Sequence, residues 1–151
     1  YEDECWSNDG NGHGTHCAGT IGAIGGNDKG VTSVNPDPTK FSFYIGKGLK
    51  DSGSGWNSEI LEAVQKCVDA QANIISMSLG GGYTYTAKEQ FKEHYEDDGV
   101  LIIAAAGNDA GSSHNYPASY KHVMSVAAVD INKNKASFSQ FNNQVEIAAP
   151  G

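Results

Sequence analysis

Two histidines near the start of the chain are the residues whose type and spacing point most directly to chemistry. His13 and His16 stand three residues apart and follow the glycine-rich turn Asp9-Gly10-Asn11-Gly12. A polar turn leading into a helix predicts that His13 lies at the amino end of that helix, with an accessible ring. An imidazole ordinarily titrates near neutral pH, which suits proton transfer. The pattern therefore makes His13 a candidate general base.

Two other interpretations of the same residues remain open. Positions three apart share one face of a helix, so His13 and His16, with Cys17 beside them, could ligate a metal ion. The glutamate and the four-residue step of the His-Glu-x-x-His zinc motif are absent, however. Alternatively, the histidines could be buried and hydrogen-bonded, with no chemical role.

Asn108 is the second candidate, in a Gly107-Asn108-Asp109 turn that follows an apolar segment. Asparagine is common in turns because its side chain hydrogen-bonds the nearby backbone. Its amide NH₂ could instead donate a hydrogen bond to an oxyanion that develops during a reaction. The spacing alone leaves both interpretations open.

Helices and strands are expected to alternate around these residues. The sequence pattern predicts a helix over 14–23, a second that follows a cap at 57 or 58 and reaches 72, and a third over 86–97. It predicts strands over 41–45, 74–79, 100–105, 123–129 and 145–149. Asn57 or Ser58 would cap the second helix, and Phe91 and Tyr95 would share one face of the third. Such alternation implies an α/β fold with a mainly parallel sheet, whose functional sites lie where the strands end. Two such ends are Leu79-Gly80-Gly81 and Ala106-Gly107-Asn108.

Composition excludes several classes of protein. The 151 residues, enough for one domain or part of one, carry 10 basic residues, all lysine, and 18 acidic ones, a net charge of −8. An acidic chain without arginine is not expected to bind nucleic acid or an anionic membrane surface. The longest apolar run, 100–106, is too short to span a bilayer. Of the three cysteines, Cys5 and Cys67 have no partner that the sequence assigns.

Six segments, in order, resemble the subtilisin family of serine endopeptidases. They are Asp9-Gly10-Asn11-Gly12-His13-Gly14-Thr15-His16-Cys17-Ala18-Gly19-Thr20, Ser76-Met77-Ser78-Leu79-Gly80-Gly81, Ala104-Ala105-Ala106-Gly107-Asn108, Tyr116-Pro117-Ala118, Ala136-Ser137-Phe138-Ser139 and Ala148-Ala149-Pro150-Gly151. The cysteine after the second histidine is similar to the proteinase K branch. The resemblance covers nearly the whole chain and implies a three-layer α/β/α fold.

The resemblance also implies roles for individual residues. His13 would be the base, Asn108 would stabilise the oxyanion, and His16 would be structural. The residues that would contact the substrate are Gly53, Ser54, Gly55, Ser78, Leu79, Gly80, Ala106, Gly107 and Asn115. The side chain of Asn115, where many relatives have glycine, would shorten the pocket for the residue before the scissile bond. Cys17 would be a buried thiol beneath His13.

One departure from the family pattern concerns the catalytic triad. The family order is Asp, His, Ser, and residues 1–151 contain neither an apolar strand ending in Asp-[Ser/Thr]-Gly nor a Gly-Thr-Ser motif. We therefore expect residues 1–151 to be a partial catalytic domain, incomplete at both ends. Alone it should be inactive and should fold poorly. The alternative is a catalytically inactive subtilisin-like domain that serves in binding.

The remaining expectations also follow from the resemblance. The loop Asn27-Asp28-Lys29-Gly30-Val31 resembles the family's calcium loop, in which Asn27, Lys29 and Val31 would supply oxygen ligands, although an ordinary polar turn would explain it as well. Catalysis would need no cofactor, and calcium would be structural. The expected partner is a protein or peptide substrate, and the full domain is expected to be a secreted, extracellular monomer.

Overall fold

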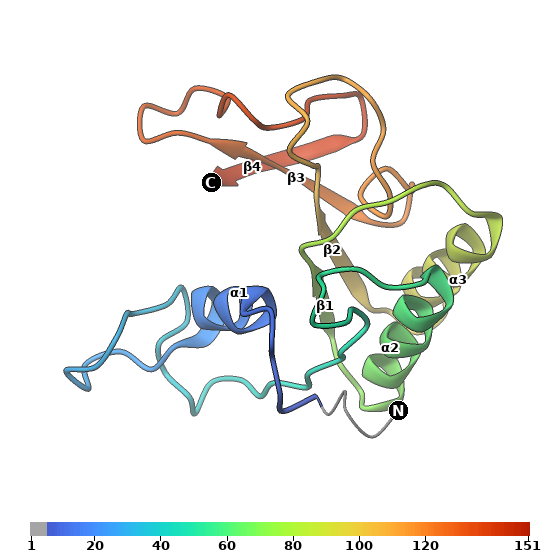
Figure 1. The fold of residues 1–151 in the computed structure, drawn as a ribbon. Coiled ribbons are helices and arrows are strands. Elements are labelled where there is room, and N and C mark those ends of the chain that lie inside the picture. Colours follow the sequence, from blue (N-terminus) through green and yellow to red (C-terminus); the bar gives the residue numbers. More distant parts are fainter. Residues whose placement is uncertain (1–5) are drawn as a thin grey trace. The chain divides into compact units, whose positions relative to one another are not determined.

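The computed structural model describes residues 6–151, in two compact units that divide after Ala70. The first unit contains α1 (His13–Gly22) and α2 (Asn57–Asp69). The second contains β1 (Ile74–Met77), α3 (Tyr85–Glu96), β2 (Leu101–Ala105), β3 (Met124–Val129) and β4 (Val145–Pro150) (Figure 1). Apart from one strand, discussed below, the expected order of helices and strands is confirmed.

The four strands of the second unit form one parallel sheet in the order β1-β2-β3-β4. Apolar side chains from its two first strands are buried, with Ile102 fully inaccessible, and α3 packs against β2. Parallel neighbours need a crossover between them, and α3 supplies it between β1 and β2. The expected α/β class is thereby confirmed. No helix within residues 6–151 is long and apolar enough to cross a bilayer.

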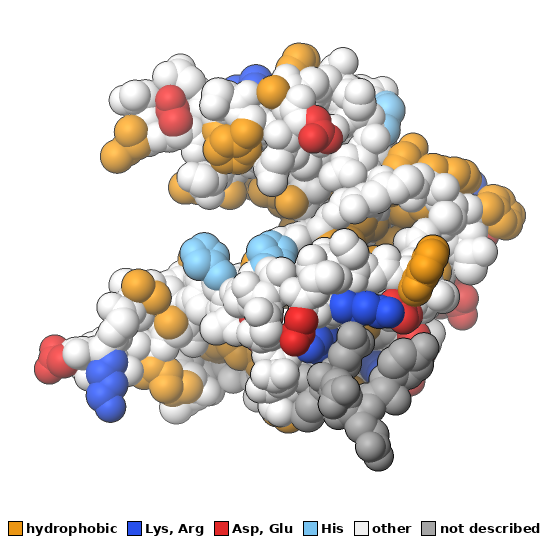
Figure 2. Space-filling view, in the orientation of Figure 1, with side chains coloured by type: hydrophobic (Ala, Val, Ile, Leu, Met, Phe, Trp, Pro, Cys, Tyr) orange, Lys and Arg blue, Asp and Glu red, His pale blue; other side chains and the backbone are white. Residues whose placement is uncertain are grey.

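The helix that begins at His13 forms as expected but buries none of its residues within the described chain. Its N-cap, Gly12, has φ 86°, a left-handed conformation that glycine adopts without a steric penalty. Many large apolar side chains elsewhere are also exposed, among them Val34, Trp56 and Ile131, and Figure 2 shows apolar patches scattered over the surface in view. Short helices depend on packing for stability, so a helix with no buried residue is weakly stabilised. That residues 1–151 fold poorly in isolation stays a prediction.

The N-cap of the second helix lies one residue before the first of its expected positions. Its N-cap is Trp56, whose backbone N–H donates to the Glu59 carboxylate at 2.9 Å, so that neither Asn57 nor Ser58 has the capping role. Leu61, Val64 and Cys67 lie on its buried face, in agreement with the periodicity of the sequence. The helix ends at Asp69, before the expected Ala72.

The prediction of a strand over residues 41–45 is wrong. This segment has no regular secondary structure, and no backbone hydrogen bond ties it to a neighbouring strand among residues 6–151. The Phe41 and Phe43 rings instead meet edge to face, with centroids 4.9 Å apart, beside Gly22 of α1. An apolar extended segment becomes a strand only where a second strand pairs with it, and the described first unit contains none.

The third helix buries only one of the two aromatic residues that were expected on its face. Phe91 is 2% exposed, but Tyr95 is 49% exposed and packs against the His122 ring, with 5.7 Å between centroids. His94 takes the buried place at 2% exposure, where its Nδ1 contacts the Asp98 carboxylate at 2.8 Å and its Nε2 contacts Gln90. A polar ring can be buried here because both ring nitrogens have partners.

Candidate active site

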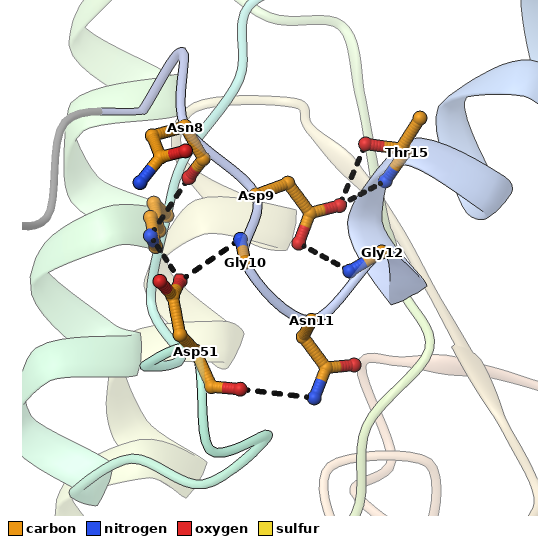
Figure 3. Close-up of polar contacts among 8 residues, drawn as sticks. Asn8, Asp9, Gly10, Asn11, Gly12, Thr15 and Asp51 are labelled. Atoms are coloured by element: carbon orange, nitrogen blue, oxygen red, sulfur yellow. Dashed lines mark hydrogen bonds and ion pairs between the residues drawn. The ribbon is translucent and has the colours of Figure 1, made fainter.

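The Asp9 carboxylate organises the turn that precedes His13. One oxygen accepts the Gly12 N–H at 2.8 Å, and the other accepts the N–H and the hydroxyl of Thr15 at 2.7 and 2.6 Å (Figure 3). Asp9 thus satisfies two of the backbone donors that the first turn of a helix leaves unpaired. These contacts fix the start of the helix at His13.

The same contacts lower the pKa of Asp9 from 3.8 to about 2, the Thr15 hydroxyl contributing most. Because the folded pKa lies below the ordinary value, the charged form stabilises the turn. That contribution is complete above about pH 4 and is lost as the pH falls through about 2.

Both histidine side chains, of His13 and of His16, are exposed in the described chain. The Cys17 sulfur lies 3.7 Å from His13 Nε2, one helical turn away, and Cys17 is partly rather than fully buried. Across residues 6–151, no three His, Cys, Asp or Glu side chains converge as a metal site would require. Of the three interpretations of these histidines, the metal site and the buried pair lack support, whereas exposure is compatible with a general base.

The Gly53-Ser54-Gly55 segment begins at a tight turn in the same unit. The Gly53 N–H donates to the Lys50 carbonyl at 2.8 Å, and the Lys50 N–H donates to the Ser54 carbonyl at 2.9 Å. Gly53 has φ 82°, which closes the turn. The three residues are exposed, as a segment that receives an extended peptide must be.

The carboxyl ends of β1 and β2 lie side by side in the second unit, because the strands pair in parallel with Met77 opposite Ala104. Ser78-Leu79-Gly80 continues from β1, and Ala106-Gly107-Asn108 continues from β2. Asn108 is exposed directly after Gly107, whose φ is 115°. The two turns therefore lie at the same edge of the sheet.

The Asn115 carboxamide lies between these two segments. A side-chain carbon built on Gly80 would clash with it, and one built on Gly107 would come within 2.9 Å of its Nδ2. The next residue, Tyr116, forms a pair of backbone hydrogen bonds with Gly81, the residue after Gly80. Behind Gly107, the buried Gln140 Oε1 has no hydrogen-bond partner in the described structure. Asn115 therefore occupies space that a glycine would leave open.

The loop that resembles a calcium site is exposed throughout. The Asn27 side-chain oxygen accepts the Lys29 N–H at 3.1 Å, and Val31 is 68% exposed. This oxygen retains a second lone pair, and main-chain carbonyls are also hard oxygen donors of the kind that Ca²⁺ prefers. The donor set fits such an ion, although the same hydrogen bond would stabilise an ordinary turn.

The sequence-predicted site residues thus fall into two groups. His13, the 53–55 segment and the 27–31 loop belong to the first unit, whereas the β1 and β2 ends, Asn108 and Asn115 belong to the second. Cys5 lies outside the described residues. Sequence reasoning missed the structural role of Asp9, since this residue stands in a polar stretch that looks like an ordinary surface loop. A carboxylate three residues before the helix N-cap was the available signal for Asp9.

Comparison with known proteins places these features in one family. The profile of the subtilase family matches residues 3–151. Subtilisin DY of Bacillus licheniformis is 43% identical over 152 residues, covering 98% of this chain and 54% of its own length. Thermitase of Thermoactinomyces vulgaris is 39% identical over 142 residues, with coverage of 94% and 50%. The chain therefore spans about half the length of these curated relatives.

A solved structure agrees with the sequence comparison. It is the psychrophilic subtilisin-like protease Apa1 from the Antarctic psychrotroph Pseudoalteromonas sp. AS-11. The match has a TM-score of 0.83 and 48% sequence identity, and it covers 90% of this chain and 31% of that one. From the family profile, the sequence identities and the shared fold, we conclude that this chain belongs to the subtilase family of serine peptidases.

Proposed function

We propose that the protein is a serine endopeptidase that cleaves peptide bonds through a Ser-His-Asp triad of which His13 is the histidine. The observation that carries the proposal is the match of residues 3–151, which include His13, to the subtilase family, together with an exposed His13 at a helix start that Asp9 organises. The serine and the aspartate of the triad would come from sequence outside residues 1–151. Residues 1–151 alone are then expected to be inactive.

In this mechanism His13 moves one proton in each direction. It takes the proton of the serine hydroxyl while the serine oxygen forms a bond to the carbonyl carbon of the substrate. It then gives that proton to the departing amine as the peptide C–N bond breaks. The first half of the reaction leaves the acyl group of the substrate bonded to the serine oxygen. In the second half, water attacks this ester while His13 takes a proton from the water. His13 then returns a proton to the serine oxygen as the carboxylic acid leaves.

Asn108 would stabilise the negative oxygen that forms in each half of the cycle. Its amide NH₂ is a neutral donor on an exposed turn that follows the end of β2 and Gly107. A donor that is already oriented needs no reorganisation when the charge appears, so it stabilises the transition state more than the substrate. Cofactors have no part in these steps.

By resemblance to the family, Gly53-Ser54-Gly55 and Ser78-Leu79-Gly80 would each contact the backbone of the substrate. Both are exposed or partly exposed, and both contain glycine, which lets a peptide backbone approach closely. Recognition through backbone hydrogen bonds tolerates many side chains, so we infer broad specificity for proteins and peptides. Ala106, Gly107 and Asn115 would line the pocket for the residue before the scissile bond.

The direct test uses a fluorophosphonate, which labels only an activated serine, on the full-length natural protein. We expect stoichiometric labelling, loss of labelling in a His13→Ala variant, and hydrolysis of an unfolded protein substrate. A full-length protein that binds peptides but reacts with neither reagent would instead establish the alternative, a catalytically inactive binding domain.

The side chain of Asn115 is expected to restrict the residue before the scissile bond to small or medium size. Asn115→Gly removes the carboxamide that lies between Gly80 and Gly107, and should raise kcat/KM for phenylalanine relative to alanine at that position by about tenfold or more. A peptide-library profile of both proteins measures this ratio. Asn143→Gly, at an exposed position outside these segments, serves as the matched control. A wild-type preference for phenylalanine or tyrosine would contradict the prediction.

We also propose that the 27–31 loop holds a structural Ca²⁺ through the Asn27 side chain and the carbonyls of Lys29 and Val31. A chelator should then lower the melting temperature of the full-length protein, because an ion bound only by the folded state stabilises it. Asn27→Ala should reduce the difference between calcium-loaded and chelated samples. An unchanged melting temperature on chelation would remove the site from consideration.

Two further properties are inferred from the family resemblance. We propose that the protein acts outside the cell and that its full catalytic domain is monomeric. The net charge of −8 and the absence of arginine support a protein that binds neither nucleic acid nor anionic membranes. Size-exclusion chromatography of the full-length protein and its recovery from culture medium would test both inferences.

A further inference from the structure

Two stretches of the first unit that are distant in sequence are joined at the point where each leads into a candidate site. The Asn8–Gly12 turn runs directly into His13, and the Lys47–Asp51 stretch leads through Ser52 into Gly53-Ser54-Gly55. Figure 3 shows the contacts between them, which centre on Asp51. We call these contacts the Asp51 bridge, which consists of Asp51, Lys47, Asn8, Gly10 and Asn11.

The bridge contains four hydrogen bonds. Asp51 Oδ1 accepts the Gly10 N–H at 3.2 Å, and the Asp51 carbonyl accepts the Asn11 side-chain amide at 3.1 Å. Lys47 Nζ donates to Asp51 Oδ1 and to the Asn8 carbonyl, both at 2.8 Å. The Lys47 side chain is only 14% exposed, so its ion pair with Asp51 is partly shielded from water. Hydrogen bonds that involve charged groups are stronger than neutral ones.

The two stretches approach so closely that one position has no room for a side chain. A carbon added at Gly10 would clash with the Asp51 carboxylate, and one added at Gly53 would come within 3.2 Å of the Asn11 amide nitrogen. Asp51 itself lies in the turn that the backbone hydrogen bonds of Lys50 close. Movement of Asp51 would therefore be transmitted to Ser54 within three residues.

We propose that Asp51 is a positioning residue, which holds the Gly53-Ser54-Gly55 segment in register with the turn that carries His13. This inference rests on the proposed function, in which that segment binds the substrate residues before the scissile bond. The contact energy of those residues accelerates the reaction only if the bound peptide is correctly placed for His13 to act. Asp51 provides that connection without touching the reacting atoms.

The two aspartates, Asp9 and Asp51, make separate sets of contacts, which makes the proposal specific. Asp9 holds the first turn of α1 through contacts with Gly12 and Thr15, none of which involves Asp51. Loss of Asp51 should therefore leave His13 in place on its helix while the substrate-binding segment becomes less well positioned. Long substrates should be affected and minimal substrates spared.

The test compares two anilide substrates that share the residue before the scissile bond. One carries a single amino acid, and the other carries four. In the full-length natural protein, Asp51→Ala should lower kcat/KM for the four-residue substrate by roughly tenfold and that for the one-residue substrate by no more than roughly twofold. The matched control is Asp37→Ala, which removes another aspartate that has local contacts to Thr39 but no contact with the bridge. For this variant, the ratio of kcat/KM for the four-residue substrate to kcat/KM for the one-residue substrate should equal that of the wild type.

Other outcomes separate this inference from the proposed function. Equal losses on both substrates, or an unchanged ratio, would overturn the role of Asp51 and leave the peptidase assignment intact. Wild-type protein that cleaves neither substrate would overturn both. If Asp51→Ala does not fold, Asp51→Asn carries the test, since it keeps an acceptor for Gly10 and loses the charge that pairs with Lys47. For Asp51→Asn, the ratio of kcat/KM for the four-residue to the one-residue substrate is expected to fall less than for Asp51→Ala. An unchanged ratio would count against the bridge.

Discussion

Replacing His13 with alanine is expected to lower kcat of the full-length natural protein by about 10⁶-fold. This magnitude is the one known for the triad histidine of subtilisin itself, a member of the same family. The loss is large because no other group can take the serine proton, so that the remaining activity comes from binding and oxyanion stabilisation. KM should change little, since alanine removes none of the proposed contacts with the substrate backbone.

His16→Ala is the matched control for that experiment. His16 lies on the same helix, is also exposed, and differs from His13 in not following the Asp9 turn directly. Its replacement should leave kcat near the wild-type value. Steady-state kinetics with a chromogenic peptide measures both variants, and circular dichroism establishes that both are folded. A His16→Ala variant that is inactive beside an active His13→Ala variant would reverse the assignment.

Replacing Asn108 with alanine is expected to lower kcat by about 10²–10³-fold with little change in KM. The value is again the one known for loss of the oxyanion donor in a subtilisin. The effect should be confined to kcat because the donor interacts with charge that exists only in the transition state. Alanine leaves the Gly107 turn and the end of β2 unchanged, so a defect in folding is not expected.

Ser112→Ala provides the comparison for Asn108→Ala, since it shortens another exposed polar side chain in the same connection between β2 and β3. It should retain the wild-type kcat. An Asn108→Ala variant with raised KM and unchanged kcat would indicate that Asn108 binds the ground state of the substrate. In that case the amide would not be the oxyanion donor.

Local patterns predicted most of the regular structure. The spacing of Leu61, Val64 and Cys67 fixes the buried face of α2, and the apolar runs before Gly80 and Gly107 predict β1 and β2 within one or two residues. Such predictions succeed because a helix or a buried strand reflects the period of its own side chains. The shared edge of β1 and β2 was likewise predictable, since parallel neighbours end on the same side.

The sequence pattern did not anticipate two features that depend on which partners a segment or side chain finds. The apolar segment at 41–45 resembles a strand but has no strand beside it, and Phe41 and Phe43 pack on each other instead. In α3, both Tyr95 and His94 fit the helical pattern, but the buried place goes to His94, whose ring nitrogens find Gln90 and Asp98. Hydropathy ranks the two residues in the opposite order because it takes no account of available partners.

The amino-acid sequence by itself determined the family of this protein, the alternation of helices and strands, and the identity of His13 and Asn108 as candidates, because these depend on residue type and short spacing. Only the tertiary structure showed that the Asp51 carboxylate meets Gly10, that Lys47 joins them to Asn8, and that Asn115 lies between Gly80 and Gly107. The contacts of the bridge join residues 39 and 41 positions apart in the sequence. No local pattern encodes such contacts, since they form only when the chain has brought both partners together.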